Sequence, residues 1–191
     1  MNKRMFLATC ASLAALGLLS TGCTTTSGQS ANPEARRQTI NAGADQALSR
    51  LYKEVPGSKD MVASAKGVLV FPNIVGGGFI VGGSHGNGVL RKGGQTAGFY
   101  STTTGSVGLL AGAQSKALFI LFMTQDALDR FERSNGWTAG ADGSVTLINV
   151  GASANITTQT ANQPIVGYVL TNAGLMANLS LDGTRFVRLD L

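Results

Sequence analysis

Short apolar runs separated by glycine dominate this chain from residue 67 onward. The sequence has 26 glycines among its 191 residues, and only 13% of its residues are charged. Glycine allows tight turns and close packing of strands, whereas long solvated helices need many more charged side chains. The pattern therefore favours tightly turned β-structure over a bundle of helices.

The apolar runs themselves predict the strands. Residues 68–71 form a short run closed by Pro72, and residues 116–123 form a continuous run suited to a central strand covered on both faces. Asp182-Gly183, between the last two runs, is typical of a type I′ hairpin turn. The remaining short strands are expected at residues 79–81, 89–90, 98–100, 106–110, 145–150, 152–157, 165–171, 175–181 and 186–191.

A long helix is expected before the first strand. Asn32 is a suitable N-cap for a helix with Pro33 at its first position, where the missing N–H costs nothing. Pro56-Gly57 ends this helix. Its apolar side chains recur at three- and four-residue spacing and form one buried face, which consists of Ile40, Ala44, Ala47, Leu48, Leu51 and Val55.

Two shorter helices complete the helical part of the prediction. Ser58 is the expected cap of a second helix that runs to about Ala65, with Met61 and Val62 inward and Gly67 as a left-handed stop. Thr124 is the expected cap of a mid-chain helix of about ten residues. The buried side chains of that helix are Ala127, Leu128 and Phe131.

Together these elements predict an α+β fold in which the sheet is dominant. About nine strands joined by hairpins, in a chain of this size, favour an antiparallel β-rich barrel or sandwich. Two N-terminal helices and one mid-chain helix pack against it.

The first 22 residues have the three parts of a secretory signal. Lys3 and Arg4 form the positive start, residues 5–19 the apolar core, and residues 20–22 the small residues before a cut. The cut leaves Cys23 at the new N-terminus, which resembles the lipobox of bacterial lipoproteins, with Ser20 in place of the usual Leu. We expect a signal peptide at residues 1–22, a lipidated Cys and flexible linker at residues 23–32, and a single domain at residues 33–191.

Two other interpretations of the apolar segment remain open. A transmembrane helix needs about 20 strongly apolar residues, and this run is shorter and rich in Ala, Ser and Thr. An ordinary signal peptide would release a soluble protein with a free Cys23, which is a reactive thiol in an oxidising compartment. Cys10 is removed with the signal, so the mature chain has one cysteine and forms no intramolecular disulfide.

Charge and residue types argue against several function classes. Without Lys3 and Arg4, 13 basic and 10 acidic side chains leave a formal charge of +3 instead of +5, and they form no stripe suited to nucleic acid. His85, the only histidine, lies in the glycine-rich stretch 82–88, where we expect an exposed loop tip. With one histidine, no free Cys and no paired carboxylates, we expect no enzymatic activity, no metal and no other cofactor.

Basic side chains are the candidate lipid contacts. Arg36-Arg37 on the first helix and Arg91-Lys92 at the end of the glycine-rich stretch are expected as exposed charges that attract anionic phospholipid headgroups. Lys66, between the second helix and the first strand, joins this set. Solvated surface charges are the more ordinary interpretation of such pairs.

Several motifs, in their order along the chain, resemble the SYLF-domain family. They are found at residues 65–71, 78–83, 86–90, 112–115 and 174–183, and the resemblance covers about residues 34–191. The family includes bacterial lipoproteins and eukaryotic proteins that bind phosphoinositides and actin. The resemblance implies a non-enzymatic, lipid-associating, β-rich domain. The Trp-Ser-Pro segment of eukaryotic members is replaced here by residues 96–101, and their basic extension by a lipobox and linker.

Two hypotheses of function follow. The first is a lipid-anchored bacterial envelope protein whose domain binds lipid, and Thr24 after the anchor places it, by the usual sorting rule, at the outer membrane facing the periplasm. The second is a structural module that recruits a protein partner through its sheet or an edge strand.

Overall fold

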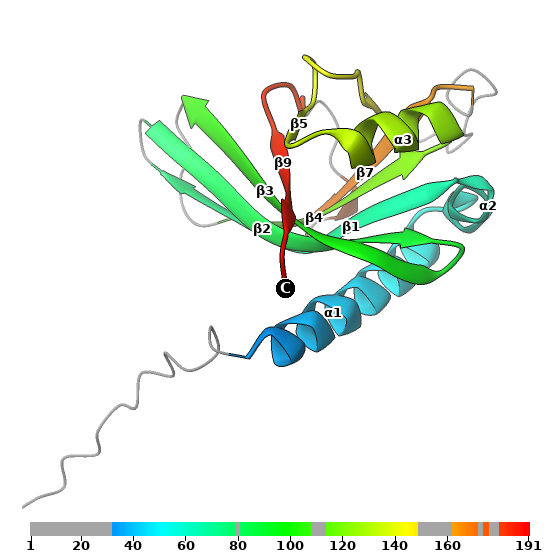
Figure 1. The fold of residues 1–191 in the computed structure, drawn as a ribbon, viewed down its shortest axis with the longest axis horizontal. Helices are drawn as coiled ribbons and strands as arrows, with labels where there is room; N and C mark the ends of the chain where they lie inside the picture. The colour runs from blue at the N-terminus through cyan, green and yellow to red at the C-terminus, as the bar shows by residue number, and fades with distance from the viewer. Residues whose placement is uncertain (1–31, 79–80, 108–113, 149–161, 172–173, 176–179) are drawn as a thin grey trace, which may run out of the picture.

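A single curved sheet with helices on both of its faces forms this protein (Figure 1). The computed structural model describes residues 32–78, 81–107, 114–148, 162–171, 174–175 and 180–191. The helices are α1 (Pro33–Glu54), α2 (Ser58–Ser64) and α3 (Gln125–Arg133). The strands are β1 (Gly67–Gly78), β2 (Val81–Lys92), β3 (Gln95–Val107), β4 (Gln114–Phe122), β5 (Trp137–Thr138), β6 (Thr146–Leu147), β7 (Ile165–Thr171), β8 (Gly174–Leu175) and β9 (Arg185–Leu189).

The strands follow the order β5-β9-β3-β2-β1-β4-β7-β6, and β8 pairs with β7. Every pair is antiparallel except β6 with β7. The sheet curls into a half-barrel. The evidence is that the ring centroids of Phe71 on β1 and Phe186 on β9 lie only 5.5 Å apart, although two strands separate β1 from β9 in the sheet. The α+β class with a dominant sheet is therefore confirmed.

Helix α1 covers the outer side of the curved sheet, as its apolar pattern predicts (Figure 1). The Asn32 side chain accepts hydrogen bonds from the backbone N–H groups of Glu34 and Ala35, so the predicted cap is confirmed. All six predicted apolar side chains of this helix are buried. A Cβ at Gly43 would lie 3.1 Å from Pro72 Cγ, so α1 approaches β1 closely at this point.

Two details around α2 differ from the sequence prediction, namely its N-cap residue and the role of Gly67. The N-cap is Gly57, with φ of +79°, and Ser58 is buried with its hydroxyl donating to the carbonyl oxygens of Val55 (2.6 Å) and Leu51 (3.2 Å). Gly67 is not left-handed and begins β1. Its missing side chain leaves room for Leu128, whose Cδ1 would lie 2.8 Å from a Cβ there.

Strand β1 does not end at Pro72, which is a second correction. The strand continues to Gly78, and its register with both β2 and β4 shifts by one residue between Val70 and Ile74. Proline has no N–H for the ladder, and a β-bulge is where a central strand tolerates it. The bulge bends β1 and its neighbours away from α1.

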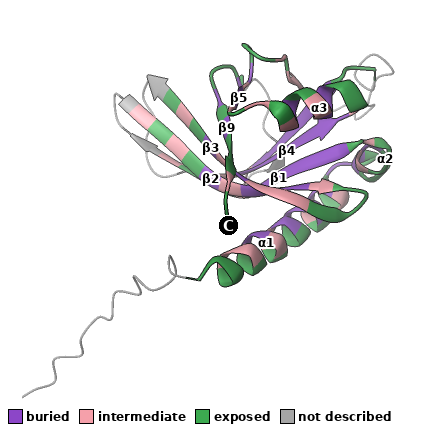
Figure 2. Cartoon of the chain, viewed as in Figure 1, coloured by how far each residue is buried: buried purple, intermediate pink, exposed green. Residues whose placement is uncertain are grey.

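Strand β4 separates two hydrophobic clusters, which confirms the predicted central strand covered on both faces. Ala117, Phe119 and Leu121 pack on the α1 side, whereas Leu118, Ile120 and Phe122 pack on the α3 side. Figure 2 shows β4 as a buried strand. Helix α3 has the predicted cap, with Thr124 Oγ1 accepting from the backbone N–H of Ala127. Its three predicted apolar side chains are buried.

The C-terminal strands pair differently from the predicted hairpin. Gly183 has φ of +78° and lies in a turn, but β9 pairs with β3 on one side and β5 on the other. Because both edges of β9 are occupied at Arg185 and Phe186, no third strand pairs there. Strand β7 has the predicted bounds. The predicted strand at residues 152–157, and parts of those at 79–81, 106–110, 145–150 and 175–181, lie outside the described residues.

Candidate functional site

The five basic side chains predicted as lipid contacts lie at three places in the fold. Arg36 and Arg37 are in the first turns of α1, Lys66 lies between α2 and β1, and Arg91 and Lys92 end β2. The predicted lipidation residue Cys23 lies outside the described residues.

The two arginines of α1 have polar contacts near the helix start. Arg36 Nη2 donates to Asn87 Oδ1 on β2 at 3.2 Å, which links the first turns of α1 to the middle of that strand. Arg37 Nη1 lies 3.2 Å from Glu34 Oε2, and both of these side chains are exposed. Exposed pairs of this kind contribute little to stability. The Arg37 side chain, which is 41% exposed, is accessible to an external anion, whereas Arg36 is partly buried.

Arg91 points toward α1 and is largely buried. Its side chain is 15% exposed, its Nη1 pairs with the carboxylate of Asp45, and its Nη2 donates to the carbonyl oxygen of Asn41 at 3.2 Å. Its Nε is buried and has no hydrogen-bond partner among the described residues. Arg91 therefore links β2 to α1. The sequence predicted an exposed side chain at this position, and that prediction is wrong.

Lys92 points to the opposite face of the sheet. Its Nζ lies 3.0 Å from both carboxylate oxygens of Glu132 on α3. Lys66 is exposed, and its backbone N–H donates to the carbonyl oxygen of Phe122 at 2.8 Å. Consecutive side chains of a strand point to opposite faces, so the pair Arg91-Lys92 is divided between α1 and α3. The five basic residues do not form one patch, and their contact with lipid stays a prediction.

His85 lies within β2 and is not at a loop tip, which corrects the sequence prediction. It pairs with Val75 on β1 and Thr103 on β3, and its side chain is exposed as expected. The glycines around it form continuous strand, because Gly86 and Gly88 leave room for Ile74 and Phe71 of β1. The sequence suggested that these glycines permit tight turns and close packing of strands, and the structure shows the close packing at Gly86 and Gly88.

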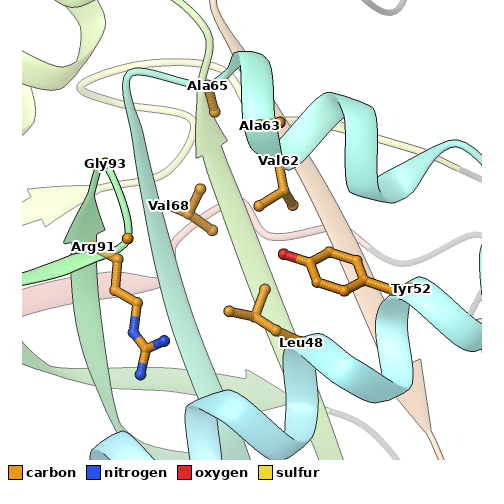
Figure 3. Close-up of a pocket in the computed structure, with 9 residues that line it drawn as sticks. Leu48, Tyr52, Val62, Ala63, Ala65, Val68, Arg91 and Gly93 are labelled. Atoms are coloured by element: carbon orange, nitrogen blue, oxygen red, sulfur yellow. The ribbon is translucent and has the colours of Figure 1, made fainter.

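A pocket of about 270 Å³ opens where α1 and α2 meet the end of β2 (Figure 3). Leu48 and Tyr52 project from α1, Val62 from α2 and Val68 from β1, while Arg91 lies at one side. Burial raises the pKa of Tyr52, and the nearby Arg91 charge opposes this shift. The other lining residues are Ala63, Ala65, Gly93 and Gly94. Sequence reasoning missed this pocket, since its walls come from four separate elements.

Neither a metal site nor a membrane-spanning helix is found within the described ranges. No group of three or more His, Cys, Asp or Glu side chains there is placed to hold a metal ion. No helix in the same part of the chain is both long and apolar enough to cross a bilayer.

A family model described as "Ysc84: Las17-binding protein actin regulator" matches residues 103–190. Over these residues the chain resembles the Ysc84 (SYLF) family. The match confirms the resemblance indicated by the sequence motifs for this part of the chain, which contains the motifs at residues 112–115 and 174–183. The Ysc84 segment begins within β3 and continues through β9. Its strands β4 and β7 share one hydrophobic cluster with α1, α2, β1 and β2, which precede the match. No curated protein matches the chain.

Proposed function

We propose that this protein is a lipid-anchored bacterial envelope protein whose Ysc84 domain is a non-enzymatic, lipid-binding module. The observation that carries the proposal is Cys23, which directly follows a segment with the three parts of an export signal. The Ysc84 match adds support, because motifs of this family also pointed to lipid association. Thr24 favours the outer membrane, with the domain in the periplasm.

The short distance between the anchor and the folded domain supports this proposal. Helix α1 begins at Pro33, directly after its capping residue Asn32. Residues 24–32 span at most about 32 Å, since an extended chain covers about 3.6 Å for each residue. An acylated Cys23 therefore keeps the start of α1 close to the bilayer. Arg36 and Arg37 are in that part of the helix, where each adds about 1 kcal/mol of attraction to anionic lipid.

The proposal assigns no catalytic role to the domain. The only histidine of the chain, His85, is exposed on β2, and its ring Nδ1 lies 3.5 Å from Thr103 Oγ1. General acid–base or nucleophilic catalysis needs a positioned pair of such groups in a sheltered site. The part of the chain that the structure describes holds no arrangement of this kind around His85.

Substitution of Cys23 tests the anchor. Cys23→Ala should abolish incorporation of radiolabelled palmitate and release the protein from membranes, because acyl chains contribute about 0.8 kcal/mol for each buried CH₂. Cys10→Ala is the matched control, since Cys10 lies in the segment removed with the signal and its loss should leave labelling unchanged. Retention of the Cys23→Ala protein in the membrane fraction after a carbonate wash would contradict the lipoprotein proposal.

The description of the family favours a second candidate function, recruitment of a protein partner at the envelope. That description names binding to the protein Las17 and regulation of actin. Strand β9 pairs with β3 only from Phe99 to Thr103, so in the described part of the chain Gln95–Gly98 has no strand on that side. An extended peptide can add to such an edge. Failure of the domain to bind vesicles of any composition would favour this candidate.

A further inference from the structure

Beyond the start of α1, the outer side of the sheet carries a row of side chains that none of the three described helices covers. Val89 and Phe99 pack beneath α1, and alternation along β2 and β3 places every second residue on the same side. The strand register adds the paired residues of β1 and β9. We call this surface the open sheet face, and its members are Asn73, Val75, His85, Asn87, Ser101, Thr103, Arg185 and Val187.

Two exposed valines interrupt the otherwise polar open sheet face. Val75 is 51% exposed and Val187 is 36% exposed, and they are the only exposed large hydrophobic side chains among the described residues. Both lie on this face, because their chain neighbours Ile74 and Phe186 belong to the cluster on the α3 side. Figure 2 shows the mixed exposed and intermediate surface of this end of β1–β3, in contrast to the buried strands beside it.

The open sheet face adjoins the point where the anchor segment enters the domain. The hydrogen bond from Arg36 to Asn87 joins the first turns of α1 to a member of this face. Residues 24–32, which span at most about 32 Å, connect this point to Cys23. A surface within that reach of the anchor can contact the bilayer when Cys23 is acylated.

The charge of this region is complementary to an anionic bilayer. The open sheet face contains Arg185 and His85, and none of its eight members carries a carboxylate. Arg36 borders it at the start of α1 through its hydrogen bond to Asn87, and the adjacent Arg37 is paired with Glu34. Exposed valines with arginines around them suit the headgroup region of a bilayer. The guanidinium groups can lie at the lipid phosphates while the valine methyl groups lie deeper in the bilayer.

From these observations we infer that the open sheet face lies against the bilayer that holds the Cys23 anchor. This inference rests on the proposed function and deepens it by naming the surface in contact. Shallow insertion of Val75 and Val187 orients the domain so that α3, on the other side of the sheet, points away from the membrane. The pocket beside Leu48, near the far end of α1, takes no part in this contact.

Fluorescent labels at single introduced cysteines test the orientation. In the mature full-length protein the sulfur of Cys23 carries lipid, so an introduced thiol is the only one that reacts with an environment-sensitive fluorophore. We choose Val75→Cys and Val187→Cys on the open sheet face. Arg130→Cys on α3 is the matched control, because this side chain is 69% exposed on the opposite side of the sheet. Each protein is reconstituted into vesicles of phosphatidylethanolamine and phosphatidylglycerol that contain a headgroup spin label.

The expected result is severalfold stronger quenching and a blue-shifted emission for the labels at residues 75 and 187, relative to the label at residue 130. Equal quenching at all three positions, or stronger quenching at residue 130, overturns the inference. A circular dichroism spectrum of each labelled variant should match that of the unlabelled protein. This control shows that the variants are folded, so that differences in quenching report the orientation of the domain. Mass spectrometry shows separately whether Cys23 itself carries the fluorophore. A labelled Cys23 would show that the lipid anchor is absent, which would contradict the proposed function and not the orientation of the domain.

Discussion

The guanidinium of Arg91 on β2 pairs with the carboxylate of Asp45 on α1. A second hydrogen bond, from Arg91 Nη2 to the carbonyl oxygen of Asn41, holds the same helix. The two contacts fasten the outer helix to a strand in the middle of the sheet. A residue that the sequence suggests as a lipid contact therefore has a structural role.

Replacement of Arg91 should lower the stability of the fold. Arg91→Gln removes the charge of a side chain that is only 15% exposed, and we expect a loss of about 1–2 kcal/mol. Arg37→Gln is the matched control, since its ion pair with Glu34 is exposed and should contribute almost nothing. Urea denaturation followed by circular dichroism measures both. Equal stability of the two variants would show that the contact of Arg91 with Asp45 does not stabilise the packing of α1 on the sheet.

Arg36 and Arg37 should carry the electrostatic part of membrane binding. The domain without its anchor, residues 32–191, should float with vesicles containing phosphatidylglycerol at low salt and detach as salt shortens the Debye length toward about 3 Å at 1 M. The double substitution Arg36→Gln and Arg37→Gln should remove much of this binding with little change in melting temperature. Binding that depends on neither salt nor these two residues would instead indicate an apolar contact.

The buried face of α1 should not tolerate a charge. Leu48 is 8% exposed and packs in the outer cluster, so Leu48→Asp should unfold the domain or cost several kcal/mol, a large part of a typical domain's stability. Gln46→Asp, on the exposed side of the same helix, is the control and should retain the fold. Thermal denaturation separates these outcomes. If Leu48→Asp folds normally but no longer binds vesicles, this face of α1 contacts lipid and not the sheet.

A methyl group at Gly88 should disrupt the sheet. A Cβ there would lie 2.4 Å from the carbonyl oxygen of Val70 and 2.5 Å from Phe71 Cδ1, and backbone must move to relieve the overlap. We expect Gly88→Ala to lower the melting temperature strongly, with a loss of about 1–3 kcal/mol. A Cβ at Gly105, on β3, meets nothing within 4 Å, so Gly105→Ala should be nearly neutral. A neutral Gly88→Ala would contradict the close approach of β1 and β2.

The hydroxyl of Tyr168 should make stability fall at alkaline pH. Burial raises the pKa of Tyr168 from 10.0 to about 12, and this hydroxyl has no hydrogen-bond partner among the described residues. The unfolded chain then loses this proton first, so the folded state loses stability as pH rises from 10 to 12, by about 1.4 kcal/mol per pH unit. Tyr168→Phe should flatten the dependence in this range without loss of stability at pH 7, as measured by urea denaturation. Identical pH profiles for the two proteins would contradict the assigned pKa.

Local signals in the sequence predicted the helices and the central strands. The cap at Asn32, the cap at Thr124 and the bounds of β7 are confirmed, because each depends on residues within one or two turns or on a single apolar run. Burial on both faces of β4 follows in the same way from its unbroken apolar composition.

The proposal that Cys23 is lipidated also depends on adjacent residues alone, and it stays a prediction. The open sheet face was not predicted from the sequence, because its members come from β1, β2, β3 and β9 and meet only through long-range register. Nothing local to Val75 or Val187 indicates that they share one surface beside the start of α1.

By itself, the sequence determined where most elements begin and which of their side chains are apolar, and it is the source of the proposal that an export signal precedes Cys23. Tertiary structure alone decided how β1 continues through a bulge at Pro72, why β9 pairs with β3, and why Arg91 and Lys92 separate to α1 and α3. The physical reason is the range of the interactions. Caps and periodicity act within a few residues, whereas the partner of a strand and the face that remains open depend on contacts between residues far apart in the chain.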